Sequence, residues 1–286
     1  MSRNNQDRMG SQVQSSDPPI PSIVEGFTSQ PLQFVVPTEF VELPTRGLFY
    51  PEGHSFHNKS EIEIKFMTAK EEDILTDKTL LKKGIALDRL IKSLLIDKGT
   101  NPDSLFVGDK NAILIGARKS GYGAEYDTKI ICPVCFAHGR HEFDLDEAQI
   151  TNDGVSAPDG VERTASGTFL FSTPKMGVEV ECKMLTGADE KQMIAQQKNN
   201  KKLKLPEKAL TTQLKTILVS INGNTERSYV NSFVEACTAI DSRFIRSTYQ
   251  SCVPNIELRE EYVCGECEAS TTIDVPFTTD FFWPQR

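Results

Sequence analysis

Alternating polar and apolar positions predict the first regular structure of the chain. The segment EIEIKFM (residues 61–67) changes polarity at almost every position, which is the period of a half-buried β-strand. Thr68 stands three residues before Glu71, the spacing of a helix capping box, so we expect a helix through residues 71–75. An apolar stripe near a 3.6-residue period predicts a second helix over about residues 80–95, and a third is expected over about residues 105–119.

The rest of the pattern predicts loops, a hairpin and a group of helices. Proline and glycine punctuate residues 40–53, which we interpret as a loop with an apolar centre. Two strand-like segments, GTFLFST (167–173) and VEVECKML (178–185), predict a hairpin. Helices are then expected over about residues 189–197, 206–221, 229–240 and 241–250.

Two segments far apart in the chain share one pattern. KIICPVCFAHGRHEFDL (129–145) and EYVCGECEASTTIDVPF (261–277) each have a strand, a C-x-x-C pair, a short polar stretch and a second strand. We interpret them as two copies of a β-hairpin with a cysteine turn at its tip. Within the second turn, Gly265 would permit a backbone with positive φ.

The two cysteine pairs predict a closed tetrahedral zinc site with Cys132, Cys135, Cys264 and Cys267 as ligands. In the usual ribbon the pairs are roughly 15–20 residues apart, but here a segment of well over a hundred residues separates them. Such a site would stabilise the fold and would have no open position for catalysis.

Two alternatives to the four-cysteine site stay open. The first cysteine pair could bind a metal together with His138 or His141, or the cysteines could be free or redox-active thiols. The remaining cysteines, Cys182, Cys237 and Cys252, stand alone and are expected in the core.

Composition and charge limit the class of function. The chain has 286 residues and a net charge of -8, which gives no support for a surface built to bind phosphate backbones. Seven cysteines without a secretory signal indicate a reducing cytoplasm, and we expect no membrane span. The sequence has no H-E-x-x-H, G-x-S-x-G, Walker A or G-x-G-x-x-G motif, and His54 and His57 are expected to be exposed loop residues.

Several stretches resemble segments of one known family and occur in the same order as in that family. They are LPTRGLFYP (43–51), IKFMTAKEEDILTDKTLLKKGIALDRLIKSLL (64–95), LFVGDKNAILIGARKSGYGAEY (105–126), the cysteine pairs, LTGADE (185–190) and FFWP (281–284). Together they resemble the baseplate hub proteins of T-even-like bacteriophages with contractile tails. The resemblance covers residues 38–286 and implies a structural or assembly component of the tail baseplate, without catalysis.

The resemblance also implies partners and a location. We expect other baseplate or tail proteins as partners, with the tape-measure protein as a candidate, and leave a homo-oligomer open. The virion tail, the host cytoplasm during assembly, or both would be the location. Nucleic acid is not expected, although a zinc-ribbon regulator that binds nucleic acid is the alternative function. The predicted contact residues are exposed apolar side chains in the first loop and at the C-terminus: Leu48, Phe49, Tyr50, Phe281, Phe282 and Trp283. Packing in the chain's own core is the competing interpretation of both groups.

The predicted fold is therefore α+β. It consists of a zinc-ribbon-like pair of β-hairpins split by a mainly helical insertion, with an N-terminal region of one strand and several helices. The predicted parts are a disordered tail (1–35), the N-terminal loop, strand and helices (36–126), the first cysteine hairpin (127–150), a strand hairpin and helical lobe (151–255), and the second cysteine hairpin with a C-terminal strand (256–286).

Overall fold

The computed structural model describes residues 35–286 apart from 153–156, 204–205, 207, 276–278 and 283–286. Residues 1–34 of the tail predicted to be disordered lie outside the described residues, and so does Trp283. Residues 36–286 group into one compact unit. The finer division into four parts stays a prediction, because the contacts draw no boundary inside that unit.

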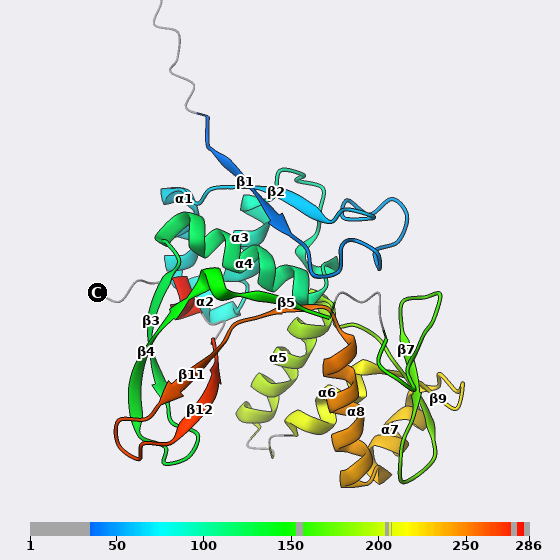
Figure 1. The fold of residues 1–286 in the computed structure, drawn as a ribbon. Coiled ribbons are helices and arrows are strands. Elements are labelled where there is room, and N and C mark those ends of the chain that lie inside the picture. The colour runs from blue at the N-terminus through cyan, green and yellow to red at the C-terminus, as the bar shows by residue number, and fades with distance from the viewer. Residues whose placement is uncertain (1–34, 153–156, 204–205, 207, 276–278, 283–286) are drawn as a thin grey trace, which may run out of the picture. The chain divides into compact units, whose positions relative to one another are not determined.

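The N-terminal region combines a two-stranded sheet with four helices (Figure 1). Its elements are β1 (Thr38–Glu42), β2 (Glu61–Lys65), α1 (Ala69–Thr76), α2 (Lys78–Lys83), α3 (Ala86–Leu94), the short 3-10 helix η1 (Pro102–Ser104) and α4 (Val107–Tyr122). Thr68 and Glu71 form the expected capping box at the start of α1. The helix expected over residues 80–95 is interrupted, because Gly84 takes a left-handed φ of 74° and ends α2.

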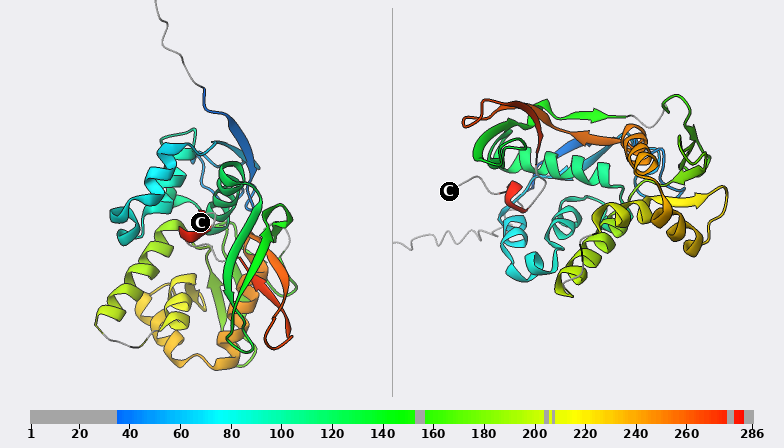
Figure 2. Two further views of the ribbon diagram at one scale, coloured as in Figure 1. Left: turned by 90° about the vertical axis from the view of Figure 1, so that its left-hand side faces the viewer. Right: turned by 90° about the horizontal axis from the view of Figure 1, so that it is seen from below.

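Two β-hairpins follow the pattern repeated in the sequence and lie side by side (Figures 1 and 2). They are β3 (Glu125–Ile131) with β4 (His138–Asp144), and β11 (Arg259–Val263) with β12 (Ser270–Asp274). Gly139 in β4 packs on β11 so closely that a Cβ atom there would lie 2.3 Å from the hydroxyl oxygen of Tyr262. The absence of a side chain at Gly139 therefore lets the hairpins approach.

The segment between the hairpins is mainly helical but also contains two sheets. One pairs β5 (Gln149–Thr151) with β10 (Asn255–Glu257), and the other has the order β6-β7-β8-β9, with β6 (Glu162–Arg163), β7 (Phe169–Ser172), β8 (Glu179–Cys182) and β9 (Leu218–Ile221). The helices are α5 (Gly187–Lys202), α6 (Ala209–Ile217), α7 (Arg227–Ala236) and α8 (Ala239–Cys252), and the short 3-10 helices η2 (Leu145–Glu147) and η3 (Thr279–Phe282) lie after β4 and β12.

The helix expected over residues 206–221 was wrong in its last turn. Residues 218–221 leave α6 and pair antiparallel with β8. Three of these four side chains are buried, so pairing with a strand from another part of the chain overrides the apparent helical period. The α+β class, with cysteine-tipped hairpins separated by a largely helical insertion, is confirmed.

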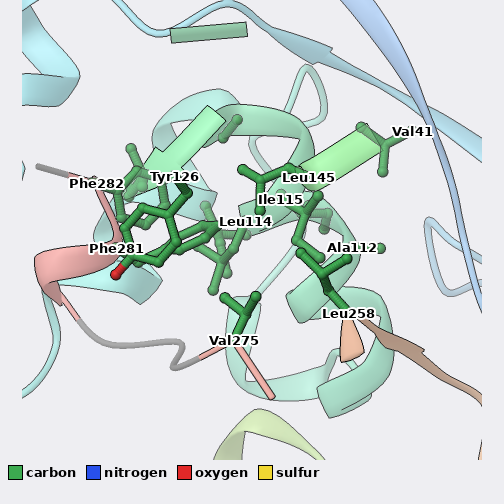
Figure 3. Close-up of a cluster of buried hydrophobic side chains, with 14 of the residues drawn as sticks. Val41, Ala112, Leu114, Ile115, Tyr126, Leu145, Leu258, Val275, Phe281 and Phe282 are labelled. Atoms are coloured by element: carbon green, nitrogen blue, oxygen red, sulfur yellow. The ribbon is translucent and has the colours of Figure 1, made fainter. Parts of the chain in front are cut away.

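The main hydrophobic core joins the N-terminal helices to both hairpins and to the C-terminal segment. Figure 3 shows side chains of α4, such as Leu114 and Ile115, next to Tyr126 of β3 and to Val275 after β12. A second core lies in the helical lobe, where β7, β8 and β9 pack on α6, α7 and α8. Among the other cysteines, Cys182 and Cys252 are buried as expected, whereas Cys237 is half-buried.

A cluster of charged residues connects the helices of the two regions. The ammonium group of Lys110 in α4 is buried and lies 3.1 Å from Asp88 of α3 and 2.7 Å from Glu190 of α5. Lys191 of α5 lies 3.1 Å from Asp88 and also pairs with Asp103 of η1. Lys110 and Asp88 are largely withdrawn from water, so loss of either would leave an uncompensated charge, whereas water reaches Glu190, Lys191 and Asp103 and weakens their pairs.

Candidate metal centre

The four cysteines of the two C-x-x-C pairs come together at the tips of the two hairpins. Cys132 and Cys135 lie in the turn from β3 to β4, and Cys264 and Cys267 in the turn from β11 to β12. Each hairpin is paired in register up to its turn, with Ile131 opposite His138 and Val263 opposite Ser270. The strands therefore deliver each pair of thiols to one end of the paired hairpins.

The two turns have the same backbone hydrogen bonds. The amide of Cys132 donates to the carbonyl of Ala137 at 2.9 Å, and the amide of Phe136 donates back to the carbonyl of Cys132 at 2.9 Å. The second turn repeats both bonds, from Cys264 to Ala269 at 3.1 Å and from Glu268 to Cys264 at 2.9 Å. The sequence repeat therefore corresponds to a repeated turn.

The residue with positive φ in these turns is not the one we expected. Gly265 does not adopt a positive φ, whereas Phe136 has a φ of 61° and Glu268 a φ of 55°. In both turns it is the residue after the second cysteine that reverses the chain, so the glycine at position 265 is not required for this purpose.

The distances between the sulfurs fit a tetrahedral metal site. Cys132 Sγ lies 3.9 Å from Cys267 Sγ, and Cys135 Sγ lies 3.6 Å from Cys264 Sγ. All four sulfurs lie within 4.8 Å of one another. A zinc–sulfur bond of about 2.3 Å places the sulfurs of a regular tetrahedron about 3.8 Å apart. None of the seven cysteines forms a disulfide in the structure.

The peptide amides of the turns favour thiolates at two of the four positions. Amides of Cys135 and Val134 lower the pKa of Cys132. Amides of Cys267 and Glu266 lower the pKa of Cys264 to about 6.

The pKa of a third thiol of the cluster, Cys135, shifts in the opposite direction. The amide of Ala137 lowers the pKa of Cys135, but contacts with the other three thiols raise it to about 12. Four thiolates at this separation would repel one another, so they need a cation between them. The donor set and the spacing fit a bound Zn²⁺, with one sulfur from each cysteine as ligand.

The histidines of the first hairpin are not part of this cluster. His141 Nε2 lies 2.9 Å from a carboxylate oxygen of Glu260 on β11, and the other oxygen of Glu260 accepts the amide of Asp144 at 2.9 Å. His141 therefore connects the two hairpins. Within the part of the chain that the structure describes, the four cysteines form the one group of three or more His, Cys, Asp or Glu side chains able to share a metal.

The histidines of the first loop have a role that the sequence did not indicate. His54 is half-buried, stacks on Tyr50 with ring centroids 4.4 Å apart, and lies within 2.9 Å of Ser104 Oγ. His57 Nδ1 lies 2.6 Å from the carbonyl oxygen of Tyr50. We expected both to be exposed, but they pack within the loop and hold its conformation.

The structure distributes the predicted contact residues between the surface and the core. Leu48 is exposed and Phe49 is half-buried. Tyr50, Phe281 and Phe282 are buried, at 3%, 1% and 0% exposure. These three side chains favour the competing interpretation, packing in the chain's own core, because they offer almost no surface to a second protein.

Comparison with known proteins gives one match. The model of a family described as "T4 bacteriophage base plate protein" matches residues 52–283 of the chain. No curated protein and no solved structure matches. Among the described helices, none combines the length and the apolar character needed to cross a bilayer.

Proposed function

The chain belongs to the T4 bacteriophage base plate protein family, and from this membership we propose that it is a non-catalytic structural or assembly component of a baseplate hub. The family supports a location in the virion tail and other phage tail proteins as partners. We extend this proposal to the host cytoplasm during assembly as a second location and to the tape-measure protein as a candidate partner. A homo-oligomer is compatible with the proposal.

The cysteine cluster carries the second half of the proposal, a structural zinc. Its four sulfurs come from two hairpins that flank the helical insertion and approach to within 4.8 Å. Cys132, Cys135, Cys264 and Cys267 would hold the ion, which would supply a crosslink between the two ends of the insertion. A closed set of four thiolates leaves no coordination position for substrate, which agrees with a role in structure.

Three measurements test the two halves of this function separately. Metal analysis of the purified protein should find about one zinc per chain, the content of a single four-cysteine site. Mass spectrometry of purified tails should detect the chain if it remains in the particle. A phage that lacks the coding sequence should assemble tails only when the protein is supplied from a plasmid. Normal tail assembly without the protein would contradict the baseplate role, whatever the metal content.

The second hairpin does not offer the electropositive surface that the alternative function, a zinc-ribbon regulator that binds nucleic acid, would need. Glu261, Glu266 and Glu268 are exposed around its turn, and negative charge there repels phosphate. A binding assay with DNA and RNA at increasing salt separates the two functions. A regulator would bind with a steep dependence on salt, whereas a baseplate component should show no appreciable binding.

A further inference from the structure

The outer edge of β1 has no strand partner among the described residues. β1 pairs only with β2, in a two-stranded antiparallel sheet. At one end of this sheet the amide of Leu43 donates to the carbonyl of Ser60, and at the other the amide of Phe66 donates to the carbonyl of Pro37. In an antiparallel pair of strands, every second residue forms backbone hydrogen bonds with the partner strand. Glu39 and Val41 therefore face β2 with their backbone groups.

The same alternation directs the other backbone groups away from β2. The N–H and C=O groups of Thr38, Phe40 and Glu42 point to the open edge. Phe40 adds an apolar side chain there that is 66% exposed. An open strand edge of this kind is a template for pairing with another extended chain.

An open cavity lies directly beside this edge. It has a volume of about 390 Å³ and is lined by residues 39–42 of β1, by Ala112, Ile115, Gly116 and Lys119 of α4, by Ile150 and Ile256 of the β5–β10 sheet, and by Arg46 and Ala148. Figure 1 shows α4 running between β1 and β5. The cavity thus combines apolar side chains of α4 and of the β5–β10 sheet with charged ones, next to a row of unpaired backbone groups, a combination that can bind an extended peptide.

The carboxylates around the edge outnumber the cations left to neutralise them, which favours a basic partner. Arg46 and Lys119 also line the cavity, but Lys119 already forms an ion pair with Asp146. Glu42 stands directly opposite Glu61 in the sheet, and like charges in this position destabilise a strand pair. One buried oxygen of Glu39, Oε1, has no hydrogen-bond partner in the described part of the chain. No ion pair within the described ranges neutralises Glu39, Glu42 or Glu61.

We propose that the outer edge of β1 binds an extended segment of another phage tail protein, which adds one strand beside β1 and directs one basic side chain toward Glu39 on one face of the sheet and another toward Glu42 on the opposite face. The cavity over α4 receives the apolar side chains of that segment. This inference rests on the proposed baseplate function and identifies the surface and the chemistry of the contact. A second copy of this chain is a poorer occupant, because its own β1 would bring two more glutamates to an edge where carboxylates already outnumber the unpaired cations.

A proline substitution can remove an outward-pointing N–H group of β1 without disturbing the hydrogen bonds between β1 and β2. Phe40→Pro removes an N–H group that points outward, and it leaves the ladder with β2 intact. Phe40→Ala removes the same side chain but keeps the N–H group, so it is the matched control. Val41→Pro removes an N–H group that faces β2 and serves as the destabilised reference.

The test is complementation of a phage that lacks the coding sequence, with each full-length variant supplied from a plasmid. Thermal unfolding of the purified variants should place Phe40→Pro close to Phe40→Ala and well above Val41→Pro. Phe40→Pro should then yield fewer infectious particles than Phe40→Ala, because it loses one hydrogen bond at the interface, which is worth about tenfold in the dissociation constant. Glu42→Lys should also lower the yield.

Equal yields from Phe40→Pro and Phe40→Ala would overturn the proposal and leave the baseplate function standing. If Phe40→Pro unfolds like Val41→Pro, hydrogen exchange of the wild-type protein decides instead. The amides of Phe40 and Glu42 should exchange fast in the isolated chain and become protected in a complex isolated from infected cells, and fast exchange in both would overturn the proposal. Self-association through this edge, lost in Phe40→Pro, would overturn the choice of occupant.

Discussion

The side chain of Arg118 binds the carbonyl oxygen of Phe281 across 163 positions of sequence, with 3.0 Å between Nε and the oxygen. Its two terminal nitrogens donate to the carbonyls of Gly123 at 2.7 Å and Glu125 at 2.9 Å. Arg118 is 2% exposed, and its guanidinium lies 5.3 Å from the ring centroid of Tyr122. One arginine therefore holds the end of α4, the start of β3 and the C-terminal segment together.

Replacement of Arg118 should destabilise the fold strongly. Arg118→Met leaves the buried carbonyl of Phe281 without its donor and removes the donor of two further carbonyls at exposed residues, so we expect the free energy of unfolding to fall by about 1–3 kcal/mol. Arg118→Lys should recover little of this loss, because one ammonium cannot reproduce the planar fork of the guanidinium. Urea unfolding of Arg118→Met and Arg118→Lys measures both losses of stability. Arg243→Met, at an exposed arginine of α8, is the control and should change the free energy of unfolding little. A change at Arg118 as small as this one would contradict the assigned role.

Removal of one ligand should abolish metal binding. Cys264→Ser should reduce the zinc content from about one per chain to near zero and lower the midpoint of thermal unfolding, because the metal contributes folding free energy. Cys237→Ser changes a half-buried cysteine outside the cluster and should keep the metal. Elemental analysis and thermal unfolding with and without a chelator measure the two effects. Full zinc content in Cys264→Ser would disprove the four-cysteine site.

A glycine at position 136 should stabilise the first turn. Phe136 has a φ of 61° and is 74% exposed, so its side chain strains the backbone and buries little. Relief of a left-handed residue is worth about 1–2 kcal/mol, from which the extra freedom of glycine in the unfolded chain subtracts about 0.4–1 kcal/mol. Phe136→Gly should therefore raise the free energy of unfolding by about 0.8 kcal/mol, and by no more than about 1.6 kcal/mol.

Denaturant unfolding of the zinc-loaded protein tests this gain. Val134→Gly is the matched control in the same turn, because Val134 is also exposed but does not have a positive φ. It should lose stability from the greater freedom of the unfolded chain. A loss of stability in Phe136→Gly would show instead that the phenyl ring contributes to the folded state.

The hydroxyl of Tyr50 should be needed to hold the first loop on α4. It donates to Asp109 Oδ2 at 2.7 Å and accepts the amide of Phe106 at 3.0 Å. Tyr50→Phe leaves both groups without this partner in a buried site, so we expect a loss of about 1–3 kcal/mol. Chemical unfolding measures the loss. Stability equal to wild type would mean that other groups satisfy both partners.

The same site predicts a pH dependence. Burial raises the pKa of Asp109 above its ordinary value of 3.8, although hydrogen bonds from Thr45 and Tyr50 oppose the shift. A raised pKa means that folding favours the protonated carboxyl, so its contribution to stability is present below the unfolded-state pKa and is lost as the pH rises through the folded-state pKa.

Comparison with Asp109→Asn isolates this contribution, because asparagine does not titrate. The stability of the wild type relative to Asp109→Asn should fall as the pH rises from below about 3.8, the ordinary pKa of an aspartate. Guanidinium unfolding of both proteins over a series of pH values measures the difference. A difference that stays constant, or rises with pH, would exclude a raised pKa at Asp109.

Short-range patterns predicted much of the local structure. The capping box of Thr68 and Glu71, the alternation of residues 61–67 and the repeat of a strand on each side of a C-x-x-C pair depend on neighbours within a few residues. The four candidate ligands could also be named from the sequence, because C-x-x-C turns present two thiols locally. The positive φ at Phe136 and Glu268 could not, because neither residue type favours it.

The α+β class, the two cysteine turns and the start of α1 could be read from the chain alone, since each follows from the periodicity and chemistry of adjacent residues. The folded protein was needed to establish that the two turns meet, that His141 pairs with Glu260, that residues 218–221 form a strand and that Phe281 is buried. These outcomes depend on which distant segments share a core. Burial and strand pairing are set by partners more than a hundred positions away in several cases, and no local pattern specifies them.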